Sequence, residues 1–242
     1  MIIQPFHVRF DELNVRAEIP AATMLKYFQE AAGLDSESMG FGWQELQKEN
    51  LAWVLMHMQL KPLAAHIERQ PVKIKTWHAF SDKLFSRREF EVLDQQDKPL
   101  MQGSSWWVLM DTQKRRIARS PERLLALNPQ TPHFLLEAAN FKTPLPATEP
   151  VSRFRVRARL EDLDINGHVN NTHYAAWAVE SVPEAVRNAK QLDEMLLAFK
   201  NECRHNELVH TDVYPESENA FWHVLTRESD GKEAARVYTK WK

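Results

Sequence analysis

Residues 162–171 read Asp-Leu-Asp-Ile-Asn-Gly-His-Val-Asn-Asn and place a carboxylate, an amide and an imidazole at alternate positions, Asp164, Asn166 and His168. Gly167 lies inside this run, and apolar residues at helical spacing follow it. Asp and Asn beside a glycine also form ordinary turns that cap helices. The stretch therefore predicts a loop before a helix, and that loop serves either as a cap or as a chemical site.

A related loop is predicted 150 residues earlier in the chain. A shift of 150 residues without any gap places apolar residues on apolar residues: Leu13 on Leu163, Val15 on Ile165 and Ile19 on Val169. The three polar positions become Asn14, Arg16 and Glu18 in the earlier copy. Because the order of strand, loop, helix and further strands also recurs, the sequence predicts a duplicated unit with its chemistry in the second copy only.

The first half is expected to contain a long helix followed by a sheet. Alternation predicts an extended segment over residues 6–18, and Pro20 is expected to open a helix that stops at Gly33. A turn and a short second helix are expected around residues 39–43. Period-two patterns predict strands over residues 51–60, 72–80, 84–93 and 100–110. The short connections between these strands favour an antiparallel meander.

Proline marks the boundary between the halves, because six of the thirteen prolines fall between residues 121 and 150. Residues 131–150 are therefore predicted to be a semi-rigid linker, with a short helix near residues 134–139. The first domain is expected over residues 1–130 and the second over residues 151–242. The second is predicted to hold a helix around residues 174–182 and strands over residues 153–159, 195–203, 207–214, 220–227 and 234–241.

The composition is that of an ordinary globular protein, with 43% apolar and 26% charged residues. A net charge of −2 gives no global basic field, so nucleic acid is not an expected partner. The chain lacks a signal-peptide pattern and any apolar run near the roughly 20 residues that span a bilayer. The one cysteine, Cys203, fits a reducing compartment, and we expect a cytoplasmic protein.

No cofactor or metal is expected from the sequence. Glycine is scarce, at six residues, and no G-x-G-x-x-G or Walker pattern occurs. The ten histidines show neither an H-E-x-x-H motif nor a Cys/His ligand spacing.

The run from Asp164 to Asn171, followed by Tyr174, Trp177 and residues 180–183, resembles the signature of the fatty acyl–acyl carrier protein (acyl-ACP) thioesterases. Residues 201–204, Asn-Glu-Cys-Arg, resemble the family's downstream Glu-Cys element, and residues 107–110 and 115–117 resemble its strand and turn in the first half. The resemblance covers nearly the whole chain. Because no plastid transit segment is evident, the chain resembles a bacterial member of the family.

This resemblance implies an α+β double hotdog fold, in which two tandem repeats each wrap an antiparallel sheet around a long helix. It implies hydrolysis of acyl-ACP to free fatty acid and holo-ACP, which ends fatty acid elongation. The first hotdog would then be non-catalytic and would bind the acyl chain.

The resemblance also implies four catalytic residues, Asp164, Asn166, His168 and Glu202. Thioester hydrolysis needs an activated water or a nucleophile, an oxyanion stabiliser and a proton for the leaving thiol. His168 can exchange protons near neutral pH, and Glu202 can orient it or act with it. Asn166 can bind the carbonyl or fix the imidazole, and Asp164 either activates water or attacks directly. Backbone N–H groups between Gly167 and Val169 are the expected oxyanion donors.

The strand predicted over residues 195–203 makes the orientation of Glu202 uncertain. Alternation places Glu202 opposite the apolar Leu197 and Phe199, so that a bulge or a strand end is needed to turn it inward. The same alternation sends Cys203 the other way, and a lone cysteine is usually a small core residue. We therefore expect that Cys203 is not the nucleophile.

Further residues are expected to bind the substrate. Gly167 and Val169 would contact the thioester, and four residues of the first half would line an acyl tunnel or pack in the core: Trp43, Trp53, Met56 and Met58. An acidic ACP would favour two basic clusters. One is Arg115 and Arg116, and the other is Arg153, Arg155 and Arg157, which also fit a solvated strand face.

Two other functions remain open at this point. A hotdog hydratase or dehydratase also uses acid, amide and imidazole groups on this loop, although typically with a proline and a spacing of five from Asp to His, where this chain has four. A non-catalytic acyl-binding hotdog protein is the second. The sequence leaves a monomer or a homodimer open, and it does not reveal the acyl chain length.

Overall fold

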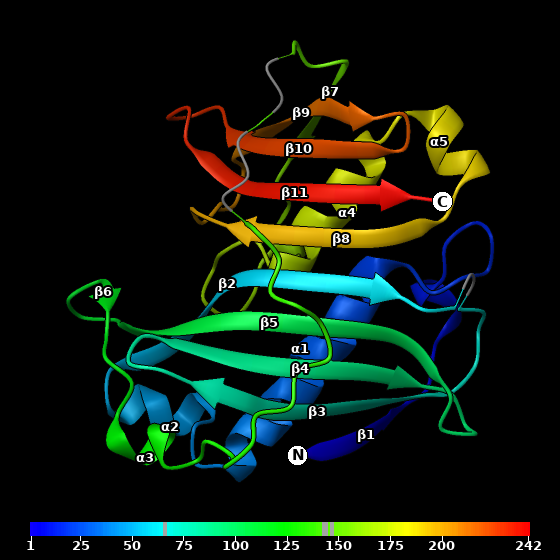
Figure 1. The fold of residues 1–242 in the computed structure, drawn as a ribbon. Helices are drawn as coiled ribbons and strands as arrows, with labels where there is room; N and C mark the ends of the chain where they lie inside the picture. Colours follow the sequence, from blue (N-terminus) through cyan, green and yellow to red (C-terminus); the bar gives the residue numbers. More distant parts are fainter. Residues whose placement is uncertain (65–66, 142–144, 146–147) are drawn as a thin grey trace. The chain divides into compact units, whose positions relative to one another are not determined.

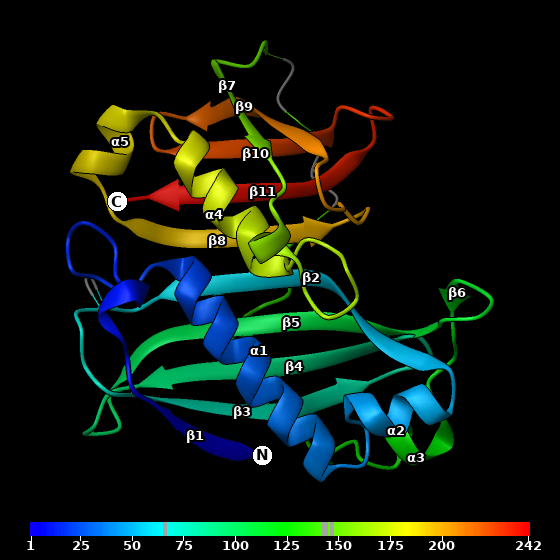
Figure 2. The same ribbon diagram turned by 180° about the vertical axis from the view of Figure 1, so that it is seen from behind.

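The computed structural model describes residues 1–64, 67–141, 145 and 148–242, which form two compact units, Met1–Ala138 and Ala139–Lys242. Each unit packs a long helix against an antiparallel sheet (Figures 1 and 2), which confirms the α+β hotdog architecture predicted for both halves. Residues 142–144 and 146–147 of the predicted linker lie outside the described residues. Among the helices of the described ranges, none has the length and apolar character to cross a membrane.

The sheet of the N-terminal unit runs in the order β1-β3-β4-β5-β2, and β6 pairs with β5. Its strands are β1 (Ile2–Phe6), β2 (Leu51–Pro62), β3 (Val72–Ser81), β4 (Phe85–Leu93), β5 (Pro99–Asp111) and β6 (Arg116–Ile117). Its helices are α1 (Ala21–Ser38), α2 (Trp43–Lys48), α3 (Glu122–Leu125) and the 3-10 turn η1 (Phe10–Glu12). The four predicted meander strands are confirmed. The extended segment predicted over residues 6–18 is wrong beyond Phe6, because η1 and a turn follow β1.

Helix α1 does not stop at Gly33 as predicted but continues to Ser38. Its last turns are fixed by the fully buried Asp35, whose carboxylate accepts a hydrogen bond from Arg88 of β4 at 2.6 Å. The stop is Gly40, at φ +74°, where the Phe41 N–H bonds back to the Ser36 carbonyl at 2.9 Å. This left-handed glycine closes the helix end in the usual way, and a tertiary ion pair overrides the weaker signal at Gly33.

The core of the N-terminal unit lies between α1 and the sheet. The rings of Phe28 (α1) and Phe90 (β4) stack with centroids 4.4 Å apart, and both side chains are fully buried. Gly103 of β5 permits this approach, because a Cβ there would lie 2.6 Å from the Phe28 ring. The Phe28 ring therefore packs on the sheet at a position where a side chain larger than that of glycine would clash.

The helix predicted over residues 134–139 is wrong: this segment runs irregularly against the sheet face that lies away from α1 (Figure 1). Its contacts are made by sheet side chains. Trp77 Nε1 donates to the His133 carbonyl at 3.1 Å, and the Arg87 guanidinium lies 4.3 Å from the centroid of the Phe134 ring. The buried Glu89 accepts the Leu135 N–H at 3.1 Å. These tertiary bonds replace the bonds that a helix would make.

The sheet of the C-terminal unit runs in the order β8-β11-β10-β9-β7. Its strands are β7 (Ser152–Arg157), β8 (Leu192–Phe199), β9 (Leu208–Ser217), β10 (Ala220–Arg227) and β11 (Glu233–Trp241). Its helices are α4 (Asn171–Ser181), α5 (Glu184–Ala189) and the 3-10 turn η2 (Leu160–Asp162). The predicted strands and the long helix are confirmed, except that β8 ends at Phe199 and not at residue 203. The sequence reading missed α5.

A buried polar chain ties α4 to its sheet. The Ser181 hydroxyl donates to the Ala178 carbonyl at 2.8 Å, so it can only accept from His223 Nδ1, which also lies at 2.8 Å. His223 Nε2 then accepts from the Thr239 hydroxyl at 2.9 Å, and Thr239 accepts from Trp241 Nε1 at 3.0 Å. In this assignment His223 is neutral and carries its proton on Nδ1. Complete burial accordingly lowers the pKa of His223 to about 3.

We predict that His223 makes the stability of the C-terminal unit depend on pH. Its folded pKa lies below the value of about 6.5 that an unfolded histidine has, so the contribution is complete above pH 6.5 and is lost as the pH falls toward 3. Urea unfolding of wild type and His223→Gln between pH 7 and 4.5 measures it. Below pH 6.5 the difference in unfolding free energy should shrink, with a slope that approaches about 1.4 kcal/mol per pH unit. A difference that stays constant over this range would contradict the neutral assignment.

Candidate active site

The loop before α4 is held by the side chain of its first polar residue. Asp164 Oδ1 accepts the N–H groups of Asn166 at 2.8 Å and His168 at 3.3 Å. The Asp164 N–H donates to the His168 carbonyl at 2.7 Å, and Gly167 occupies the left-handed region at φ +74°. This is an Asx-type turn in which one carboxylate oxygen does the work of a backbone acceptor.

The N-terminal unit builds the same loop from different residues. Asn14 Oδ1 accepts the N–H groups of Arg16 at 2.9 Å and Glu18 at 3.0 Å, and Ala17 has φ +58° where Gly167 has +74°. The Asn14 N–H donates to the Glu18 carbonyl at 2.9 Å, as the Asp164 N–H does to His168. The loop shape therefore needs an Oδ1 acceptor and does not need a negative charge.

The structure brings two of the predicted residues into direct contact. His168 Nε2 lies 3.2 Å from Glu202 Oε2, and both side chains are about one-third exposed, at 31% and 34%. The other carboxylate oxygen of Glu202 accepts from Arg204 at 3.0 Å. Because a carboxylate only accepts hydrogen bonds, we assign the imidazole proton to Nε2, which faces Glu202, and the lone pair to Nδ1.

Glu202 reaches His168 because β8 ends three residues earlier. The backbone of residue 203 then pairs with the loop, as the Val169 N–H donates to the Cys203 carbonyl at 2.8 Å. Arg227 of β10 donates to the Glu202 carbonyl and also binds Asp230, which fixes the segment from its other side. The alternation of side chains along a strand does not apply to Glu202, because the strand ends before it. The structure therefore meets the condition stated above, that a strand end would let the Glu202 carboxylate point inward.

Arg204 and Arg227 were missed in the sequence reading. Arg204 adjoins the Glu-Cys pair and could have been noticed as a cation within reach of Glu202. Nothing local marks Arg227, which lies 25 residues further along the chain.

Backbone oxyanion donors between Gly167 and Val169 are a correction to the sequence reading. The Gly167 N–H donates to the Asp164 carbonyl at 3.0 Å, the His168 N–H to Asp164 Oδ1, and the Val169 N–H to Cys203. All three groups are therefore used inside the loop. The side chain of Asn166 is exposed, and its amide makes no hydrogen bond to any described residue. It is the donor that stays available to a ligand.

Cys203 is fully buried. Burial raises the pKa of its thiol to about 11. A thiol with this pKa is almost wholly protonated at neutral pH, whereas a nucleophilic cysteine acts as the thiolate. The geometry agrees with a core role for Cys203.

The residues expected to line an acyl tunnel occupy different environments. Trp53 packs against the buried cluster of Phe41, Leu46, Leu109 and Leu124, and its Nε1 donates to the Phe41 carbonyl at 3.1 Å. Trp43 is half exposed on α2, and Met58 is buried. Met56 falls where β2 and β5 shift register, so it is the extra residue of a β-bulge. The described contacts do not gather these side chains around one cavity.

The two basic clusters also differ in their surroundings. Arg153 forms two hydrogen bonds to Asp212, at 2.5 and 2.8 Å, and Arg155 binds Glu228. Arg157 is exposed and reaches the Asn206 carbonyl at 3.4 Å. Arg115 is exposed in the turn between β5 and β6, and Arg116 is exposed at the start of β6. The charges of Arg153 and Arg155 are thus offset within the C-terminal unit.

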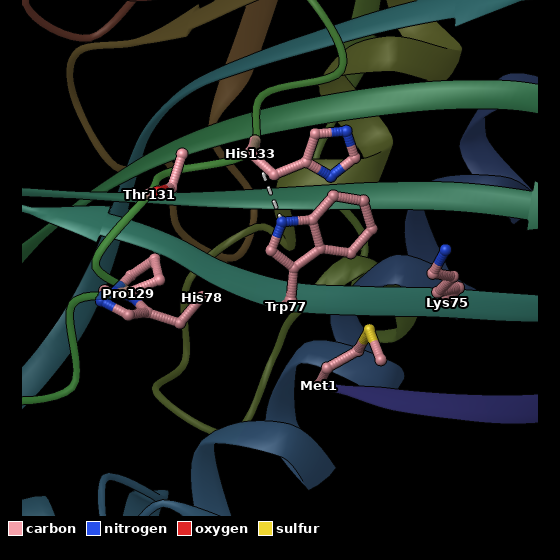
Figure 3. A pocket seen from close by; sticks show the side chains of 7 residues that line it. All are labelled: Met1, Lys75, Trp77, His78, Pro129, Thr131 and His133. Carbon is pink, nitrogen blue, oxygen red and sulfur yellow. Dashed lines mark hydrogen bonds between the residues drawn. The ribbon is translucent and has the colours of Figure 1, made fainter.

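The N-terminal unit contains a cavity of about 310 Å³ that includes none of the predicted site residues. Figure 3 shows its lining, in which the Trp77 ring stacks on His133 with centroids 5.4 Å apart. Met1, Lys75, His78, Pro129 and Thr131 complete it. No sequence pattern predicts this cavity, because Trp77 and His78 on one side lie more than fifty residues from Pro129, Thr131 and His133 on the other.

Comparisons with family models and with curated proteins indicate the same family. The model for the acyl-ACP thioesterase N-terminal domain matches residues 2–127, and the model for the C-terminal domain matches residues 146–242. A chloroplast acyl-acyl-carrier-protein hydrolase of Cuphea viscosissima is 30% identical over 99% of this chain and 62% of its own length. An oleoyl-acyl carrier protein thioesterase of Coriandrum sativum is 27% identical over 88% of this chain and 62% of its own. The chain thus spans about three fifths of these curated relatives.

Two solved structures share the whole fold. An acyl-ACP thioesterase from Bacteroides thetaiotaomicron has a TM-score of 0.87 at 20% identity and covers 99% of this chain and 97% of its own. The 12:0-ACP thioesterase from Umbellularia californica has a TM-score of 0.81 at 22% identity and covers 100% and 96%. These likenesses show that the double hotdog fold extends over both units.

We predict that Asp164→Ala destabilises the C-terminal unit by about 1–2 kcal/mol, because two backbone N–H groups lose their acceptor. Asp164→Asn should change the unfolding free energy by less than about 0.5 kcal/mol, since Asn14 holds the equivalent loop with the same oxygen. Urea unfolding at pH 7 compares the three proteins. Equal losses for the Ala and Asn variants would contradict the shared loop frame.

Proposed function

Because this chain belongs to the acyl-ACP thioesterase family, we propose that it hydrolyses fatty acyl-ACP to a free fatty acid and holo-ACP. The observation that carries the proposal is the pair of His168 and Glu202, 3.2 Å apart, beside the loop that Asp164 holds. The relatives' names state the same class of substrate. Release of the fatty acid would end its elongation on the carrier.

His168 is the proposed general base. Its Nδ1 has no hydrogen-bond partner among the described residues and carries the lone pair, since Nε2 faces Glu202. Nδ1 removes a proton from a water molecule that attacks the thioester carbonyl, and Glu202 stabilises the imidazolium that results. The proton then passes to the sulfur as the C–S bond breaks. One water is consumed, and a carboxylic acid and a free thiol are formed.

Asp164 and Asn166 supply the remaining roles. Asn14 holds the first-unit loop without a charge, so the carboxylate of Asp164 exceeds what the loop shape requires. Its negative charge is therefore assigned to the reaction, where it orients the water and favours the imidazolium. The exposed amide of Asn166 donates to the carbonyl oxygen as negative charge develops there, in place of the backbone donors that the loop already uses.

The N-terminal unit is proposed to bind and not to hydrolyse. At the position of His168 it has Glu18, which accepts from the Asn14 amide at 3.2 Å and pairs with Arg16 at 3.2 Å. The N-terminal unit therefore has no imidazole at the position where His168 is proposed to move a proton. We assign the acyl chain to this unit, ACP as the partner, and a reducing, cytoplasmic compartment in which the single cysteine stays a thiol.

We predict that acyl-ACP releases free thiol in the presence of wild type, with no change in enoyl absorbance. His168→Ala should lower the rate about 10²–10⁴-fold, because it removes the group that moves the proton. Asn166→Ala should lower it about 10²–10³-fold through loss of the oxyanion donor. Thiol release is followed with a chromogenic disulfide reagent.

Asp164→Asn serves as the matched variant, since it keeps the loop and removes only the charge. It should unfold like wild type and lose at least about 10²-fold in rate. Full activity would overturn the catalytic assignment of Asp164. A change in enoyl absorbance without thiol release would point to a hydratase or dehydratase. Binding of acyl-ACP with neither change would point to a binding protein.

We predict that Cys203→Ala retains activity within about tenfold of wild type, because its buried thiol stays protonated. The same thiol assay, applied to the two proteins at pH 7.5, measures this. A loss as deep as that of His168→Ala would require a thiolate mechanism and would reject the role assigned to His168.

A further inference from the structure

One end of the N-terminal sheet combines positive charge with exposed apolar side chains. Residues 82–86 form the turn after β3 and the start of β4, and residues 111–119 run from the end of β5 through β6 into the segment after it. Figure 1 shows both at the same end of the sheet, and the Ser120 N–H donates to the Lys83 carbonyl at 2.9 Å. These residues, 82–86 and 111–119, are called the hairpin surface below.

The hairpin surface carries five cations and two carboxylates. Both carboxylates are engaged: Asp82 accepts the N–H groups of Leu84 and Phe85, each at 2.7 Å, and Asp111 pairs with Lys114 at 3.3 Å. Within the described ranges, three of the cations have no carboxylate within ion-pair distance: Lys83, Arg116 and Arg119, all exposed. Their charge is therefore available to an incoming anion.

Apolar side chains lie among these cations. Leu84 is 42% exposed, Phe85 is 39% exposed and Ile117 is 44% exposed. Large apolar groups that stay in water beside unpaired charges are typical of a surface that meets another protein, where the apolar part supplies affinity and the charges supply orientation.

The arginines of β7 make a weaker surface for the same partner. Asp212 and Glu228 already neutralise Arg153 and Arg155, so an acidic partner would have to displace a bonded carboxylate from each. The partner would gain little from that exchange. Among the described residues, only Arg157 of the three β7 arginines lacks a carboxylate partner. The hairpin surface instead offers three such cations, Lys83, Arg116 and Arg119, beside exposed apolar side chains.

We propose that the hairpin surface docks the acidic carrier protein, with Lys83, Arg116 and Arg119 facing its carboxylates and Leu84, Phe85 and Ile117 packing against its apolar side chains. The proposal rests on the proposed function, which makes ACP the bearer of the substrate. Long-range attraction would speed the encounter, and this effect weakens as salt screens the charges.

The test reverses two of the charges. Arg116→Glu with Arg119→Glu is compared with Lys98→Glu with Lys190→Glu, which changes the net charge by the same amount at one exposed and one half-buried position outside the hairpin surface. The dissociation constant of holo-ACP is measured by calorimetry. Rates are measured with acyl-ACP and with the acyl thioester of N-acetylcysteamine, a small uncharged thiol that needs no docking.

We expect the Arg116/Arg119 variant to bind holo-ACP at least about tenfold more weakly, and to lose a similar factor in kcat/KM for acyl-ACP, with a flatter salt dependence. The rate with the small thioester should not change, and the Lys98/Lys190 variant should match wild type. Unchanged holo-ACP affinity, or equal losses in both charge variants, would overturn the docking surface. If wild type binds holo-ACP through this surface but cleaves neither thioester, the docking stands and the hydrolysis fails.

Discussion

The site depends on a single side-chain acceptor that shapes a loop. In both units one Oδ1 atom, of Asn14 or Asp164, gathers the N–H groups of the residues two and four positions later. This contact turns the chain so that the fifth residue of the loop, Glu18 or His168, begins a backbone pairing with a later segment. The first unit forms the same loop without the residues proposed for catalysis, so those residues are additional to the loop's shape.

Because the loop occurs twice, the residues that set its shape can be distinguished from those that serve the proposed reaction. The first unit needs only an amide at the turn and can hold an alanine at positive φ, while the second has a carboxylate and a glycine there. Because the hydrogen bonds match to within about 0.3 Å, the differences cannot be read as requirements of folding. The proposed reaction accounts for the three groups that folding does not require: the carboxylate of Asp164, the exposed amide of Asn166 and the imidazole of His168.

The two units also solve one packing problem with different polar groups. Each helix must be fixed along its sheet, and apolar contacts alone permit sliding. The N-terminal unit uses the buried ion pair of Asp35 and Arg88, and the C-terminal unit uses a neutral chain through Ser181, His223 and Thr239. The neutral chain avoids the cost of burying charge, and the ion pair carries α1 beyond the glycine at which the sequence pattern ends it.

The amino-acid sequence by itself determined the duplicated α+β fold, nearly all the strands and the loop that carries Asp164, Asn166 and His168, because periodicity and turn residues act over a few positions. Only the tertiary structure decided what depends on distant groups. Strand β8 ends early, so that Glu202 contacts His168. Residues 134–138 pack on the sheet and do not form a helix. The N–H groups from Gly167 to Val169 all donate hydrogen bonds within the protein. Those outcomes rest on partners such as Arg227, Glu89 and Cys203, whose separation in the chain leaves no local pattern.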